Sequence, residues 1–199
     1  MHRLAKKAAN RMVRQGADPE LEEVYAYGIE CTLSTLVILT LLMTAGFILK
    51  KPLQMLVFIL AWLPLRMLVG GAHANTHWAC TLVSVGLGTV SVMFCAFLNR
   101  MYIAFLMMMP LSVVCCVILF LIAPVIHKNH PISMRRYRKT RIIARIYTAA
   151  ECAVVILIVL SGSRMIAPAF MGLFTTTVLA VIGWFSKNTD KTFMTVRKQ

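Results

Sequence analysis

The amino-acid sequence predicts an all-α, polytopic membrane protein with about six transmembrane helices and an N-terminal amphipathic helix. Of its 199 residues 59% are hydrophobic, whereas a soluble domain of this size needs more polar surface. The apolar residues gather in runs of about 20, the length that a helix needs to cross a bilayer. Most Lys and Arg residues lie in the polar segments that would share one side of the membrane. These observations predict a single integral membrane domain over residues 1–199.

Six apolar segments account for most of the chain. Each is close to the length of one membrane-spanning helix. They lie near residues 29–49, 52–69, 79–98, 102–126, 142–160 and 165–186. Pro64 falls inside the second segment, where a proline kinks a membrane helix or reshapes its end.

Residues 1–28 form a polar segment that precedes the first span. Leu4, Ala8 and Met12 recur at helical spacing among five cations. This pattern predicts a basic amphipathic helix on the cytoplasmic side, lying on an anionic membrane surface. The alternative interpretation is an ordinary solvated basic tail.

The distribution of Lys and Arg predicts the orientation in the membrane. With six spans, both termini, the turn at 70–78 and the loop at 127–141 share one side. That side and the adjoining helix ends carry seventeen cations, and the other side carries only Lys50, Lys51, Arg100 and Arg164. Because cytoplasmic loops are enriched in cations, both termini are predicted to be cytoplasmic in a bacterial cell membrane.

Composition also argues against several other classes of protein. A formal net charge of +14 suits nucleic-acid binding only when the cations lie on a polar domain, and here they flank apolar spans. No nucleic-acid partner is therefore expected. Five of the six cysteines fall inside apolar runs without a CxxC pair, which argues against a disulfide framework. Cys80 differs, since it lies where an apolar run meets a polar turn.

The stretch from Arg66 to Cys80 carries the reactive side chains. On a straight helix His73 and Cys80 would be separated by about 10 Å along the axis at 1.5 Å per residue. A base takes a thiol proton at about 3 Å, so a joint role requires the backbone to bend between them. Gly70 and Gly71 permit such a bend, because glycine adopts backbone conformations that other residues resist.

Cys80 is the candidate nucleophile, since a helix N-terminus and a nearby histidine both favour the thiolate. His73 is the first choice as base. His77, three residues before Cys80, is a competing base. A zinc site formed by these three residues is a further alternative. Three ligands on one straight helix reach a single ion poorly, however, and the stretch from 73 to 77 lacks the glutamate of the zincin motif. No metal or other cofactor is predicted.

Arg66 and the two acids Glu30 and Glu151 lie within or at the edge of apolar spans. Arg66 is about one turn inside the second span, where a charge is costly and suggests function, although its side chain could also snorkel to the interface. Glu30 and Glu151 could orient a histidine or pair with Arg66. For Glu151 the favoured interpretation is an interfacial pair with a basic loop residue, given that Arg141 and Arg145 lie on the same helix.

These motifs resemble those of the accessory gene regulator protein B (AgrB) family. The resemblance is carried by Arg66, Gly70-Gly71-Ala72-His73 and Cys80, and by Tyr27-Gly28-Ile29-Glu30 before the first span. The size, the six spans and the basic loop with Lys128-Asn129-His130-Pro131 agree with it. The resemblance thus covers nearly the whole chain.

Members of that family are membrane cysteine endopeptidases that process a quorum-sensing propeptide. The resemblance implies that Cys80 is the nucleophile, that His73 is its base, and that Arg66, Gly70 and Gly71 support the site. His77 and Glu30 remain candidates for orienting it. The implied substrate has an amphipathic leader, a core containing Cys or Ser, and an acidic tail. Cleavage through a thioester would release the tail, and cyclisation would give a thiolactone or lactone. A homodimer is compatible with the resemblance, and the sequence leaves the oligomeric state open.

The basic loop supports two interpretations. Its cations could hold an acidic substrate tail, or they could enforce orientation and bind anionic lipid headgroups. The residues assigned to the tail are Lys128, Arg135, Arg136, Arg138 and Lys139. The main alternative to an enzyme is a peptide transporter or membrane sensor without proteolytic activity. The spans are poor in polar residues and show no paired broken helices, which argues against a transporter.

Overall fold

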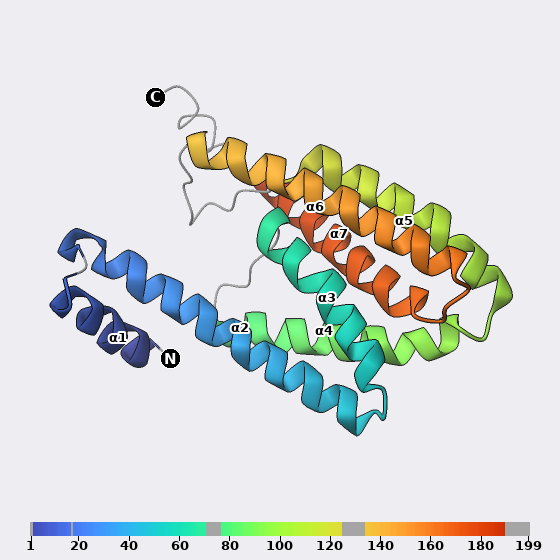
Figure 1. The fold of residues 1–199 in the computed structure, drawn as a ribbon, viewed down its shortest axis with the longest axis horizontal. Coiled ribbons are helices and arrows are strands. Elements are labelled where there is room, and N and C mark those ends of the chain that lie inside the picture. The colour runs from blue at the N-terminus through green and yellow to red at the C-terminus, as the bar shows by residue number, and fades with distance from the viewer. Residues whose placement is uncertain (1, 17, 71–76, 125–133, 190–199) are drawn as a thin grey trace.

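In the computed structural model, residues 2–16, 18–70, 77–124 and 134–189 are described, and every element within them is helical (Figure 1). The fold class is therefore all-α, as predicted. The elements are α1 (His2–Arg14), a short 3₁₀ turn (Pro19–Leu21), α2 (Glu22–Ile48), α3 (Pro52–Val69), α4 (His77–Leu98), α5 (Tyr102–Ile122), α6 (Met134–Leu160) and α7 (Ile166–Thr189).

Five of these helices, α2, α3, α4, α6 and α7, are long and apolar enough to cross a membrane. In α5 the described apolar stretch, Leu106–Ile122, is shorter. A helix therefore occupies each of the six apolar runs. Two helices begin before their runs do, at Glu22 and Met134, because helical structure continues through polar residues beyond the apolar region.

α1 confirms the predicted N-terminal helix, but its buried face is offset by one residue from the predicted stripe. Ala5 and Ala9 are fully buried, whereas Ala8 is half-buried and Met12 is exposed. α1 packs alongside the N-terminal half of α2 (Figure 1). Its small buried residues let the two helices approach closely, while Lys6, Lys7, Arg11 and Arg14 stay exposed.

α7 is the central helix of the bundle. It packs against α3, α4, α5 and α6, and 72% of its apolar window is buried, compared with 17% for α2. One core cluster includes Leu65, Leu119, Ala144 and Leu173, near the C-terminal end of α3 and the N-terminal half of α6. A second cluster joins α2 to α3 and α4. A third cluster connects α7 with α4, α5 and α6 at the other end of the bundle.

Glycines set the close packing of α3 against its neighbours. A Cβ at Gly172 of α7 would lie 2.8 Å from Cβ of Ala61 and 3.0 Å from the carbonyl oxygen of Phe58. A Cβ at Gly88 of α4 would lie 3.1 Å from Cε1 of Phe58 and 2.5 Å from Cδ2 of Leu42. Small residues allow membrane helices to approach closely. Gly88 and Gly172 therefore allow α3 to pack closely against α4 and α7.

Short turns join α2 to α3, α4 to α5 and α6 to α7 at one end of the bundle (Figure 1). These turns contain the four cations of the cation-poor side, so we predict that this end is extracellular. An impermeant maleimide applied to intact cells should label Lys50→Cys and Ser163→Cys but not Asn75→Cys. Labelling of Asn75→Cys in sealed cells would reverse the orientation.

Candidate functional site

The candidate site lies where the end of α3 meets the start of α4. Arg66 is in the last turn of α3, and Cys80 is in the first turn of α4. Both side chains are half-buried. The N-terminal turn of a helix carries partial positive charge from its unpaired backbone N–H groups. The thiol of Cys80 therefore lies in an electropositive position.

The guanidinium of Arg66 bridges the two helices. Its Nη1 donates a hydrogen bond of 3.3 Å to the carbonyl oxygen of Gly70. The guanidinium also interacts with the Cys80 side chain, both electrostatically and through a side-chain hydrogen bond. Arg66 thus satisfies a carbonyl at the C-terminal end of α3 and holds a positive charge against the cysteine in the first turn of α4.

The local sequence explains why α3 ends here. The backbone of Gly70 has φ +75°, a left-handed conformation that glycine adopts without the Cβ penalty of other residues. This conformation stops the helix and redirects the chain before α4 begins at His77. The sequence predicted this change of direction from the glycine pair.

The register of the two antiparallel helices brings Arg66 to Cys80. Phe58 contacts the Gly88 position. Phe58 and Arg66 are eight residues apart on α3, as are Cys80 and Gly88 on α4. Eight residues correspond to about two helical turns, so the same faces meet again at Arg66 and Cys80. The glycine contact in the core therefore helps to fix the geometry of the site.

For several predicted site residues the structure gives no side-chain position. Gly71, His73 and Lys128 fall outside the described residues. His77, Arg135 and Arg136 belong to described helices, but only their backbone is placed. The structure therefore brings together Arg66, Gly70 and Cys80. The roles of His73 and His77 remain predictions.

The two glutamates lie in different surroundings. Glu30 is on α2, where it interacts electrostatically with Tyr27. Glu151 is buried on α6, with Tyr147 and Cys116 as electrostatic neighbours. The favoured interfacial pair between Glu151 and Arg141 or Arg145 is not found among the described residues. A six-residue separation from Arg145 places the two side chains on different helix faces, since helical neighbours are three or four residues apart.

The basic start of α6 divides into two groups. Arg138 and Lys139 are exposed, as expected for residues that meet a ligand from solution. Arg141 and Arg145 are half-buried, and the guanidinium carbon of Arg145 lies 4.6 Å from the centre of the Phe120 ring on α5. The sequence did not distinguish these groups, although the four-residue spacing of Arg141 and Arg145 was a usable signal.

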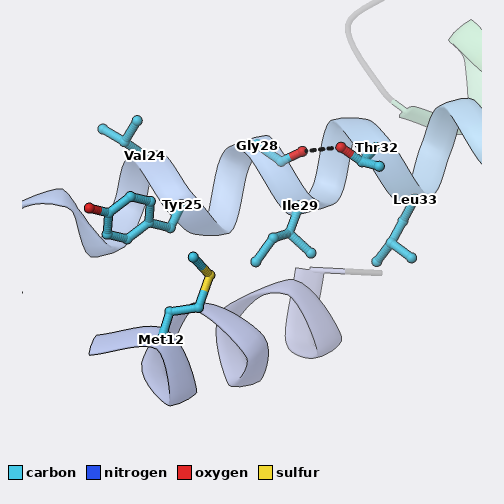
Figure 2. Close-up of a pocket in the computed structure, with 7 residues that line it drawn as sticks. All are labelled: Met12, Val24, Tyr25, Gly28, Ile29, Thr32 and Leu33. Carbon is cyan, nitrogen blue, oxygen red and sulfur yellow. Dashed lines mark hydrogen bonds between the residues drawn. The ribbon is translucent and has the colours of Figure 1, made fainter. Parts of the chain in front are cut away.

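A separate apolar groove lies between α1 and α2 (Figure 2). None of its lining residues belongs to the predicted site. They are Met12, Val24, Tyr25, Gly28, Ile29, Thr32 and Leu33. The Thr32 hydroxyl is already occupied, because it donates a hydrogen bond of 2.9 Å to the carbonyl oxygen of Gly28. The groove offers no nucleophile or base for the chemistry predicted at Cys80.

Comparisons with known proteins agree with the motif at this site. A similar protein is AgrB-like protein 2 of Clostridium perfringens (strain 13 / Type A), which is 28% identical over 166 residues, or 78% of this chain and 77% of that protein. No solved structure matches the chain. The family model described as Accessory gene regulator B matches residues 5–186, so the chain belongs to this family of quorum-sensing membrane proteins.

Proposed function

We propose that this protein is a membrane-embedded cysteine endopeptidase that removes the C-terminal tail of an autoinducing propeptide and promotes cyclisation of its core. Family membership implies a part in accessory gene regulator peptide processing. The observation that carries the finer proposal is the contact between Arg66 and Cys80 at the N-terminus of α4. A thiol beside a cation and a helix N-terminus is in a setting that favours the nucleophilic thiolate.

In the proposed first step, His73 takes the proton of Cys80, and the thiolate attacks the carbonyl carbon of the peptide bond that follows the core. The carbon–nitrogen bond then breaks, and the imidazolium of His73 protonates the leaving amine of the tail. The products are the free tail and a thioester between the core and Cys80.

In the second step, the Cys or Ser of the core attacks the thioester carbonyl. Its proton passes through His73 to the departing Cys80 sulfur, which restores the enzyme and releases a thiolactone or lactone. Water would compete in this step and give a linear product. The apolar surroundings of α3 and α4 support cyclisation, because an active site that excludes water suppresses hydrolysis of a reactive intermediate.

Arg66 serves two roles in this proposal. Its charge lies beside the Cys80 sulfur, where it would stabilise the thiolate that attacks the substrate, and its bond to the Gly70 carbonyl caps the end of α3. Hydrogen bonds to charged groups contribute about 1.5–3 kcal/mol. At about 1.4 kcal/mol for each factor of ten, loss of this interaction corresponds to about a 10- to 100-fold change in rate.

The experiment follows tail release from a panel of accessory gene regulator propeptides in proteoliposomes containing the full chain. We expect wild-type protein to release the tail and Arg66→Gln to do so about 10- to 100-fold more slowly. Arg66→Lys should retain part of the rate, because it keeps the charge but loses the planar fork. Arg164→Gln, at the other end of the bundle, is the matched control. Absence of tail release by correctly inserted wild-type protein would refute the endopeptidase proposal.

A second prediction concerns the acidic tail of the propeptide. We expect Arg135, Arg136, Arg138 and Lys139 to bind it, so neutralising all four should raise KM and leave the rate at saturation nearly unchanged. Exposed ion pairs contribute only about 0–1 kcal/mol each, so several must be removed together. The effect should weaken with salt.

The matched control for the tail prediction removes the same charge from α1, at Lys6, Lys7, Arg11 and Arg14, which are also exposed. KM should stay unchanged in that variant. Reversing acidic residues in the tail should raise KM for wild-type enzyme, and the two changes should be less than additive if they remove the same contacts. An unchanged KM for the neutralised α6 variant at low salt would contradict tail binding by this segment.

A further inference from the structure

Arg141 and Arg145 of α6 lie one helical turn apart, and neither has a protein acceptor within the described part of the chain. No hydrogen bond or ion pair to Arg141 or Arg145 is found among the described residues, and the Nε atoms of both are shielded from solvent and unpaired. A buried donor without an acceptor is costly, and more so when it is charged. The shielded Nε atoms leave the terminal Nη groups as the donors that a ligand would meet.

Phe120 fixes the position of one of these cations. The guanidinium carbon of Arg145 lies 4.6 Å from the centre of the Phe120 ring, a cation–π contact across the α5–α6 interface. The Phe120 ring orients the Arg145 guanidinium and leaves its N–H groups available as hydrogen-bond donors. Leu119 and Ala144, the neighbours of Phe120 and Arg145 in sequence, belong to the same core cluster, so the backbone on both sides is anchored.

The surroundings of the two arginines are apolar and exposed. Val117 and Leu121 on α5 and Ile142 and Ile146 on α6 are all exposed large hydrophobic residues. α6 is long and apolar enough to cross a membrane, and α5 contributes the apolar stretch Leu106–Ile122 beside it, so exposed residues of this kind suit contact with acyl chains. A ligand here therefore meets two cations one helical turn apart and exposed apolar residues on the same two helices.

We propose that Arg141, Arg145 and Phe120 form a binding site for the phosphodiester headgroup of an anionic phospholipid. The phosphate oxygens accept hydrogen bonds from the two guanidinium groups, and the acyl chains lie over the exposed apolar residues of α5 and α6. An acidic peptide offers the same charge but no acyl chain to cover that surface, so a lipid fits better. This site is independent of the chemistry proposed at Cys80.

Native mass spectrometry of the full chain in detergent tests the proposal. The probes are dioleoylphosphatidylglycerol, dioleoylphosphatidylcholine and inorganic phosphate. We expect wild-type protein to retain phosphatidylglycerol at least about tenfold more than phosphatidylcholine, and Arg141→Gln with Arg145→Gln to lose at least about fivefold of it. The matched control is Arg138→Gln with Lys139→Gln, which removes the same charge from exposed positions and should retain wild-type binding.

Two further variants separate a built site from diffuse attraction. The double variant Arg141→Lys, Arg145→Lys keeps both positive charges and should fold like the wild type. It should bind less than half as much lipid, because lysine lacks the planar guanidinium group that forms two parallel hydrogen bonds. Phe120→Leu should weaken binding several-fold by removing the ring under Arg145. Equal losses in the Arg141/Arg145 glutamine variant and its Arg138/Lys139 control would overturn the proposal. So would displacement of the lipid by inorganic phosphate or by an acidic peptide.

Discussion

Cys80→Ala is expected to abolish release of the propeptide tail, with a loss of at least about 10³-fold, because the proposed thioester cannot form without the Cys80 sulfur. Cys80→Ser should also lose most activity, since a hydroxyl ionises far less readily than a thiol. Tail release measured by mass spectrometry in proteoliposomes checks both variants. Cys116→Ser and Cys152→Ser, which alter thiols between α5 and α6, are controls and should keep near-wild-type rates.

A modified propeptide tests the role of Cys80 directly, by trapping the proposed thioester. If the nucleophilic Cys or Ser of the propeptide core is replaced by alanine, the second step is blocked and the thioester should accumulate on Cys80. Peptide mapping should place the added mass on the fragment containing Cys80, and neutral hydroxylamine should remove it. Tail release without a covalent adduct on any cysteine would contradict covalent catalysis, even if the enzyme proved to be a protease.

The helices of this protein were predictable from the sequence because hydropathy over about 20 residues reports directly on a membrane span. Helix ends were less predictable, since α2 and α6 continue through charged residues that hydropathy excludes. The buried face of α1 was also displaced, from Ala8 to Ala5 and Ala9. With alanines and leucine at several adjacent positions, a short pattern does not specify which face meets α2.

The site was only partly predictable for a different reason. The sequence indicated Arg66, Gly70 and Cys80 as site residues, but the contact between Arg66 and Cys80 depends on the register of α3 against α4. That register depends on the close packing of Phe58 against Gly88, which no local motif reports. No pair of Glu151 with Arg141 or Arg145 is found among the described residues, because Arg145 is six residues away on another face and Arg141 is about 15 Å away along the helix axis.

The change of direction at Gly70 bears on which histidine serves Cys80. The described part of α4 runs from His77, and His73 lies outside the described residues, so its separation from Cys80 stays a prediction. His77 precedes Cys80 by three residues within α4, and positions three apart on a helix are neighbours. Both histidines thus remain candidates by position, and kinetics must distinguish them.

His73→Ala is expected to lower the rate of tail release at saturation by about 10²–10⁴-fold, the usual contribution of a general acid–base. His77→Ala is the matched control and should stay within about threefold of wild type. KM should change little in either variant, because the proposed role of His73 is proton transfer and not substrate binding.

Added imidazole should restore part of the activity of His73→Ala, an effect that a purely structural histidine would not show. Alkylation of Cys80 by iodoacetamide in both variants confirms that the site is still assembled. If His77→Ala shows the large loss and His73→Ala does not, the base is His77, and it acts on Cys80 from within the first turn of α4.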